Sequence, residues 1–302
     1  MTRRRLATLG VLLIFGCAAL ALFRARPVEI FDAYTEARLR LSGAESHTTT
    51  VRGATVHYYV MGPAQGPPVV LVHGLGGRSE DWRNLAPHLT EAGFRVYLPD
   101  LLGYGHSDKP GDFSYSIADE AEVVVGFLDA LSLKQVDLGG WSMGGWIVQR
   151  IAAEHPERVH KLMLFDSAGL FVKPAWDTAL FTPESATELA KLDDLLTPHA
   201  PNLPDFVVRD ILRASRQDAW VIHRALASML TGRDTTDTLL PQLKMPVLLV
   251  WGEADQITPI SEGKTMQALI PKAQLRVIQG CGHLAPSLCA GQVGPHVVAF
   301  LR

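Results

Sequence analysis

The feature that most constrains the fold is a serine set between glycines where two apolar segments meet. Gly140, Ser142 and Gly144 form a Gly-x-Ser-x-Gly motif. The residues before it have the continuous apolar character of a buried strand, and those after it have helical spacing. A serine on a tight strand-to-helix turn is pushed out of the sheet, and flanking glycines allow backbones to approach where a Cβ would clash. The motif therefore predicts a nucleophile elbow carrying Ser142, in preference to a glycine-rich loop with an incidental serine.

Strand-like and helix-like segments alternate on both sides of this motif. We expect strands at 68–72, 94–98, 135–138, 159–165, 246–251 and 274–278, and helices at 84–92, 117–131, 143–155, 261–270 and 293–301. Such alternation is typical of βαβ units and predicts an α/β fold with a mostly parallel sheet. Residues 48–61 alternate in the manner of two short strands joined by a turn at Arg52 and Gly53.

One long segment interrupts this alternation. Residues 171–240 contain no convincing strand and several short helical stretches broken by prolines. We interpret them as a helical cap inserted into an α/β core that comprises residues 48–170 and 241–302. Residues 27–47 have a polar-to-amphipathic pattern and are expected to form a connector.

Composition and charge exclude several classes of protein. The chain is 47% hydrophobic and 20% charged, which permits a large core and argues against disorder. Its net charge of −3 offers no general attraction to nucleic acid. Eleven histidines occur without an HExxH or CxxC motif, so we expect no metal site. Three cysteines cannot form a disulfide scaffold; Cys281 and Cys289 are near enough to pair in an oxidising compartment, but partly buried free thiols are the favoured interpretation.

The amino-terminal segment predicts attachment to a membrane. Residues 6–23 are uncharged, with arginines on both sides, and a transmembrane helix needs at least about 17 such residues. We interpret residues 1–26 as an uncleaved anchor, the alternative being a signal peptide that is removed before secretion. The arginines are nearly balanced across the run, and the usual behaviour of a first segment favours a cytoplasmic amino terminus. The catalytic domain is then expected on the extracytoplasmic, periplasmic side.

Ser142 requires a base, and the base requires an acid that orients it. His283 comes just after the predicted strand at 274–278, and none of the other histidines has this context. Asp255 lies in the turn after the predicted strand at 246–251. Asp166 and Glu253 are competing candidates for the acid. Because ligands gather at the carboxyl ends of parallel strands, we expect Ser142, His283 and Asp255 to meet there.

Hydrolysis of an acyl group also requires donors for the oxyanion. The backbone N–H of Met143, directly after Ser142 at a helix N-terminus, is the first expected donor. The second is expected from the loop 73–77, which reads His-Gly-Leu-Gly-Gly and follows an early buried strand. Leu75 is the favoured donor, and Gly74 is the alternative.

Together, these motifs resemble the α/β-hydrolase superfamily over residues 48–302. The resemblance implies a mostly parallel, eight-stranded sheet with helices on both sides and a lid at the position of the helical insertion. It also implies that Asp100, in the loop Asp-Leu-Leu-Gly-Tyr-Gly-His-Ser, is structural. A serine at the elbow argues against the branches that place aspartate there. With its predicted anchor, the chain is similar to membrane-anchored monoacylglycerol lipases and small bacterial lipases and esterases.

The expected function is hydrolysis of carboxylic esters, of lipids or acylglycerols in particular, by a Ser-His-Asp triad through an acyl-enzyme. No cofactor or metal and no obligatory protein partner is expected. Hydrolysis of C–C bonds in ring-fission products, or perhydrolase chemistry, is an alternative on the same triad. A membrane-tethered binding module built on an inactive hydrolase scaffold is the alternative outside enzymes.

Overall fold

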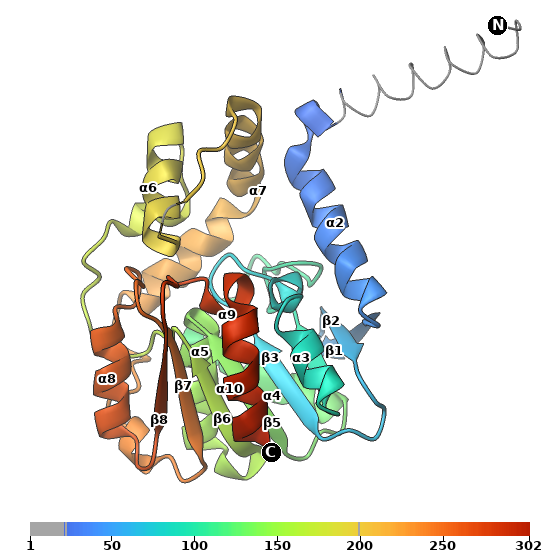
Figure 1. Ribbon diagram of the computed structural model, residues 1–302, viewed down its shortest axis with the longest axis vertical. Helices are drawn as coiled ribbons and strands as arrows, with labels where there is room; N and C mark the ends of the chain where they lie inside the picture. Colours follow the sequence, from blue (N-terminus) through green and yellow to red (C-terminus); the bar gives the residue numbers. More distant parts are fainter. Residues whose placement is uncertain (1–20, 22, 199) are drawn as a thin grey trace, which may run out of the picture.

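The computed structural model describes residues 21, 23–198 and 200–302, and its centre is a single sheet (Figure 1). The eight strands have the order β1-β2-β4-β3-β5-β6-β7-β8. Their bounds are β1 (Glu45–Val51), β2 (Ala54–Met61), β3 (Pro68–Val72), β4 (Arg95–Pro99), β5 (Val136–Trp141), β6 (Val159–Phe165), β7 (Val247–Gly252) and β8 (Gln274–Ile278). Only β2 runs antiparallel to both of its neighbours, and the pairs from β4 to β8 are parallel. The eight-stranded, mostly parallel sheet is thus confirmed.

The two strands expected at 48–61 form a tight hairpin, but they begin earlier. Arg52 and Gly53 have φ values of 51° and 84°, and Ala54 pairs with Val51 directly across the turn. Two consecutive positive φ angles are typical of the type I′ turn, whose twist matches that of the flanking strands. The predicted turn at these two residues is therefore confirmed.

Helices cover both faces of the sheet. Their bounds are α3 (Ala86–Glu91), α4 (Ile117–Ala130), α5 (Met143–Glu154), α8 (Ile260–Leu269), α9 (Ala285–Leu288) and α10 (Ala290–Leu301). Successive side chains of a strand point to opposite faces, so Val70 and Val72 pack with α4 and α5, while Val69 and Leu71 pack with α3 and α10. Burial on both faces explains why the central strands read as continuous apolar runs.

The chain between β6 and β7 is helical in its described residues and contains no strand there. Its elements are η3 (Thr178–Phe181), α6 (Ala186–Leu196), α7 (Asp205–Met229) and η4 (Leu240–Gln242), and α6 and α7 rise from the sheet at one end (Figure 1). We had expected several short helices. Instead α7 runs for 25 residues, because Pro204 sits at its N-cap and the next proline, Pro241, comes only after the helix has ended.

Residues 27–47, expected to be a connector, begin with a helix, α2 (Pro27–Leu41). Pro27 opens this helix, where the missing N–H costs nothing, and Arg38 and Arg40 in its last turn face the negative end of the helix dipole. The N–H of Val28 donates to Asp210 of α7 at 3.0 Å, and Asp210 is only 4% exposed. A buried carboxylate of α7 therefore caps the first turn of α2.

The two carboxyl-terminal cysteines correct one expectation. Cys281 and Cys289 form a disulfide, where free thiols had been favoured. The turn into α9 and α10 brings the two residues together, and sequence spacing alone could not show this. The loop that the disulfide closes contains His283.

Among residues 21, 23–198 and 200–302, no helix is both long enough and apolar enough to cross a bilayer. The predicted membrane segment, residues 6–23, lies outside the described residues except at positions 21 and 23.

Candidate active site

Ser142 stands at a strained turn between β5 and α5. Its φ of 54° lies in the left-handed region, which costs a non-glycine residue about 1–3 kcal/mol. Its N–H donates to the carbonyl of Phe165 at 3.0 Å, and its own carbonyl accepts from Ala168 at 3.1 Å. A Cβ on Gly140 would lie 2.2 Å from the carbonyl oxygen of Gly144. The geometry is that of the predicted elbow, and glycine is needed because the two backbones touch.

Asp255 and His283 form a buried pair at the carboxyl ends of β7 and β8. Nδ1 of His283 donates to Oδ2 of Asp255 at 2.8 Å, and the residues are 3% and 5% exposed, respectively. The N–H groups of Ile257 and Thr258 donate to Oδ1 of Asp255 at 2.8 and 3.0 Å, and the Thr258 hydroxyl donates to Oδ2 at 2.8 Å. These donors hold the carboxylate in one orientation, which in turn holds the imidazole.

The residue that precedes Ser142 contacts this pair. Nε1 of Trp141, the residue before Ser142, donates to the backbone oxygen of His283 at 2.8 Å. Within the described residues the ring of His283 bonds to Asp255 and Thr258, and no hydrogen bond joins it to Oγ of Ser142. Hydrogen bonds of this kind are often long in the unliganded state and tighten when substrate binds.

The two competing acids occupy other positions. Asp166 is fully buried and accepts the N–H of Gly252 at 2.6 Å, but its Oδ2 has no hydrogen-bond partner among the described residues. Burial raises the pKa of Asp166 well above its usual range, and the charge of Asp255 raises it further. Glu253 is exposed and accepts the N–H of Gly280 at 3.2 Å. Of the three candidates, only Asp255 is hydrogen-bonded to His283 in the described chain.

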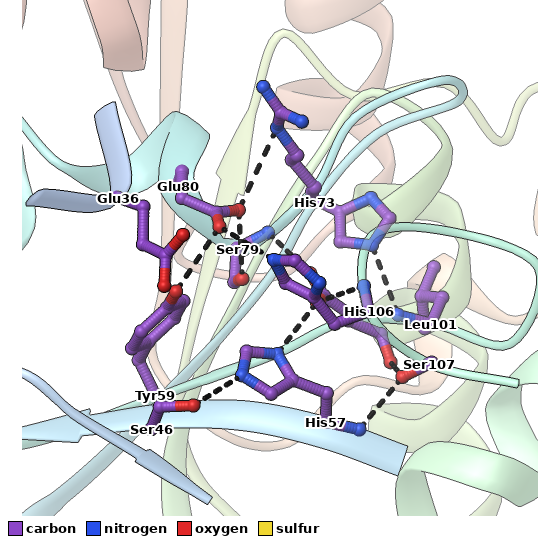
Figure 2. A network of polar contacts seen from close by, with 12 residues as sticks. Glu36, Ser46, His57, Tyr59, His73, Ser79, Glu80, Leu101, His106 and Ser107 are labelled. Carbon is purple, nitrogen blue, oxygen red and sulfur yellow. Dashed lines mark hydrogen bonds and ion pairs between the residues drawn. The ribbon is translucent and has the colours of Figure 1, made fainter. Parts of the chain in front are cut away.

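The loop 73–77 is fixed by the side chain of His73. The N–H of Leu101 donates to Nε2 of His73 at 3.0 Å (Figure 2), so the ring proton lies on Nδ1, which donates to the carbonyl of Gly74 at 2.8 Å. Because a peptide bond is planar and trans, holding this carbonyl fixes the direction of the next N–H, that of Leu75.

The two expected oxyanion donors both lie next to Ser142. Leu75 and Ser142 line the same cavity, and Gly74 is close enough that a Cβ on it would lie 3.1 Å from Cβ of Ser142. Met143 is the first residue of α5, so its N–H has no acceptor within the helix. The sequence motif alone does not indicate that the ring of His73 holds the loop in place.

A second serine–histidine–aspartate chain lies away from the cavity, and Figure 2 shows its serine and histidine, Ser46 and His57. Oγ of Ser46 is 2.9 Å from Nε2 of His57, whose Nδ1 donates to Asp100 at 2.8 Å. Burial would raise the pKa of Asp100, but the hydrogen bond from His57 and backbone donors lower it to about 2. Ser46 lies on β1 at the edge of the sheet, without a positive φ, and does not line the cavity. This arrangement fits the structural role expected of Asp100.

Ser142 opens onto a cavity of about 280 Å³ between the sheet and the helical segment. Most side chains that line it are apolar: Leu75, Trp146, Leu170, Phe171, Val172, Trp176, Phe181, Leu226, Met229, Leu230 and Ile257. Glu262 and Lys173 are its charged lining residues. Burial raises the pKa of Glu262 to about 7, and the charge of Asp255 adds to the effect. Within the described ranges, no three His, Cys, Asp or Glu side chains are grouped as metal ligands.

The family model described as alpha/beta hydrolase fold matches residues 67–220 and 232–287, and the chain therefore belongs to this family. It is 34% identical to a 2-hydroxymuconate semialdehyde hydrolase of Pseudomonas putida over 72% of this chain and 81% of that one. It is 28% identical to lipase 1 of Psychrobacter immobilis over 78% of this chain and 77% of that one. It is also similar to the crystal structure of a membrane phospholipase A described as a bacterial virulence factor, with 27% identity, a TM-score of 0.82, and 99% and 98% of the two chains covered. The family thus includes lipases and other hydrolases among its members.

Proposed function

We propose that this hydrolase cleaves carboxylic esters, with lipid or acylglycerol esters as its substrates. The observation that carries the proposal is that Ser142, on its strained turn, lines an apolar cavity beside the buried His283–Asp255 pair. Apolar walls with a few polar groups at one end suit a substrate that has a long acyl chain and one reactive carbonyl.

In the proposed mechanism, His283 takes the proton of the Ser142 hydroxyl as the serine oxygen attacks the ester carbonyl. The N–H groups of Leu75 and Met143 stabilise the oxyanion. The protonated His283 then gives its proton to the leaving alcohol, and an acyl-enzyme remains. Water, activated by the same imidazole, releases the fatty acid and restores Ser142. Asp255 keeps the proton of neutral His283 on Nδ1 and stabilises its cation.

Lipid substrates are favoured over small soluble esters for two reasons. The cavity continues to Phe171, Val172 and Leu230, which are 75%, 52% and 53% exposed, so its mouth is also apolar. The similar lipase 1 and membrane phospholipase A carry names that refer to lipid substrates. An apolar mouth suits a lipid whose acyl chain enters the cavity before its ester group does.

Hydrolysis of a C–C bond is the second candidate function. It is favoured by the identity to the 2-hydroxymuconate semialdehyde hydrolase and by Lys173, a cation in the cavity wall that suits a substrate carboxylate. Rates on glycerides with butanoyl, octanoyl and hexadecanoyl chains, compared with those on vinylogous diketones, separate the two. Turnover of the diketones alone would replace the ester proposal.

Ser142→Ala tests the nucleophile. We expect loss of p-nitrophenyl ester hydrolysis and of covalent labelling by a fluorophosphonate, with an unchanged circular dichroism spectrum. Ser46→Ala is the matched control, because Ser46 also faces a histidine–aspartate pair but lies on an edge strand. Labelling retained in Ser142→Ala would contradict the assignment, and failure of the wild-type protein to be labelled would favour the non-catalytic binding module.

We also propose that residues 6–23 anchor the chain in a membrane, with the hydrolase domain on the extracytoplasmic side. The disulfide between Cys281 and Cys289 supports this side, because disulfides persist in oxidising compartments. Protease added to intact spheroplasts should digest the domain. Protection of the domain until the spheroplasts are lysed would place it in the cytoplasm instead.

A further inference from the structure

A polar depression of about 510 Å³ lies apart from the cavity of Ser142 and shares no lining residue with it. It forms where the end of α2 and α3 meet the corner between α9 and α10, and Figure 1 shows α3 between α2 and α10. Polar lining residues are Arg38, Ser42, Arg83, Asn84, His88 and Ser287. No carboxylate is among the lining residues, so the charged side chains that line the depression are all of the cationic type.

The two arginines have no ion-pair partner in the described part of the chain. The acidic residues nearest along α2 are engaged elsewhere, since Asp32 pairs with Arg78 and Glu36 pairs with Arg40. Arg83 donates to the backbone oxygen of Glu80 at 3.2 Å. Burial lowers the pKa of Arg83, the negative charge of Asp81 raises it in part, and the positive charge of Arg38 lowers it further. The guanidinium groups of Arg38 and Arg83 therefore line the same depression, and most of their N–H groups make no hydrogen bond within the described residues.

The opposite wall adds further donors. Ser287 is only 7% exposed, and within the described residues its hydroxyl makes no hydrogen bond, although its backbone oxygen accepts Nδ2 of Asn84 at 2.8 Å. Gly291, also in this wall, belongs to the first turn of α10, whose N–H groups have no acceptor within the helix. A buried hydroxyl, the backbone N–H of Gly291 and the positive end of a helix dipole all favour an anion. The next N–H of this turn, that of Gln292, donates to the carbonyl of Cys289 at 2.8 Å.

We propose that this depression binds a phosphate group. Guanidinium groups match the oxygens of phosphate with paired, charge-assisted hydrogen bonds, and the occupant would bring the negative charge that the lining lacks. The phosphate can come from free inorganic phosphate or from the headgroup of a phospholipid. The proposal does not depend on the ester-hydrolase assignment, because no residue of the depression takes part in that mechanism.

Thermal unfolding of the full chain in an uncharged detergent tests the proposal. Inorganic phosphate, compared with sodium chloride at equal ionic strength, should raise the midpoint by about 2–3 °C at ten times its Kd. Arg38→Gln and Arg83→Gln should each weaken phosphate binding about tenfold or more. Arg276→Gln is the matched control, because Arg276 is exposed on β8 and does not line the depression.

Arg38 is exposed, so its variant keeps the test valid even if Arg83→Gln fails to fold. Equal phosphate shifts in Arg38→Gln and Arg276→Gln would overturn the proposal, as would a wild-type midpoint that phosphate moves no more than chloride does. Binding of free phosphate or of a phospholipid headgroup would support the proposal, and sn-glycerol 3-phosphate distinguishes these two sources. Tighter binding of the glycerol ester than of inorganic phosphate indicates a lipid headgroup, and weaker binding indicates the free ion.

Discussion

Asp166 and Asp255 follow neighbouring strands, and the hydroxyl of Thr258 contacts both, the backbone oxygen of Asp166 at 3.0 Å and the carboxylate of Asp255 at 2.8 Å. Their environments nevertheless differ. Asp255 accepts hydrogen bonds from backbone and hydroxyl donors, while Asp166 is buried with one oxygen unpartnered, which favours the neutral form of Asp166. Because the charge of Asp255 raises the pKa of Asp166, one negative charge on the two carboxyl groups is more stable than two.

This difference predicts opposite outcomes for two amide variants. Asp255→Asn should lower kcat by about 10³–10⁴, because an amide cannot stabilise the imidazolium and can favour the wrong tautomer of His283. Asp166→Asn replaces a neutral group of similar shape and should change kcat by less than about tenfold. Steady-state kinetics on a p-nitrophenyl ester measures both. A larger loss in Asp166→Asn than in Asp255→Asn would transfer the role of the acid to Asp166.

Gly144→Ala should destabilise the fold strongly, because the new Cβ would lie 2.3 Å from the carbonyl oxygen of Val72. The sheet cannot move away from α5 without breaking its packing, so we expect a loss of more than about 3 kcal/mol. Gly111→Ala is the control, since nothing lies within 4 Å of a Cβ there. Urea unfolding of both variants checks this, and similar midpoints would show that the elbow is less tightly packed than described.

The raised pKa of Glu262 predicts that the free energy of unfolding depends on pH. Its pKa is raised from 4.5 to about 7, so between these values the folded chain holds a proton that the unfolded chain has released. The resulting stabilisation is complete below about pH 4.5 and is lost as the pH rises through 7. Glu262→Gln should therefore gain stability relative to the wild type as the pH rises from about 5 to 8.

Thermal midpoints across that pH range measure the effect of Glu262→Gln. Glu122→Gln, at an exposed position on α4, serves as the control and should follow the wild-type profile. A constant difference between Glu262→Gln and the wild type at all pH values would contradict a raised pKa for Glu262.

The disulfide should contribute measurably to stability. Cys281 and Cys289 are separated by 8 positions, and closing a loop of this size in the unfolded chain is worth about 2–3 kcal/mol. The double variant Cys281→Ala, Cys289→Ala should lose about this amount, and dithiothreitol should lower the wild type to the same level without affecting the variant. A wild-type protein indifferent to dithiothreitol would show that the bond is absent in solution.

The strands were the most predictable part of this fold. The bounds expected for β3, β6 and β8 agree with the structure, because strands buried on both faces or bounded by turn residues leave clear patterns. The length of α7 was not predicted, because the prolines of residues 171–240 suggested several breaks, whereas they cluster before that helix. Nor did the polar pattern of residues 27–47 predict a helix, since α2 is stabilised by tertiary contacts such as that with Asp210.

For the candidate site, the sequence indicates candidate residues but not the groups that hold them in place. Ser142, His283 and Asp255 follow strands whose ends must converge, so their proximity could be inferred. Thr258 was missed, although a hydroxyl three residues after an aspartate is a common local hydrogen-bonding arrangement. The contact of Trp141 with His283 joins positions far apart in the chain, and no local pattern indicates it.

The hydrogen bond from Val28 to Asp210 joins α2, near the amino terminus, to α7, in the helical segment between β6 and β7. Further along the same helix, Leu226 and Met229 of α7 line the cavity of Ser142, so α7 is at once the partner of α2 and a wall of that cavity. A change in the orientation of α2 would be transmitted to α7 through the hydrogen bond between Val28 and Asp210. The orientation of α2 is therefore coupled, through this hydrogen bond, to a helix that lines the cavity of Ser142.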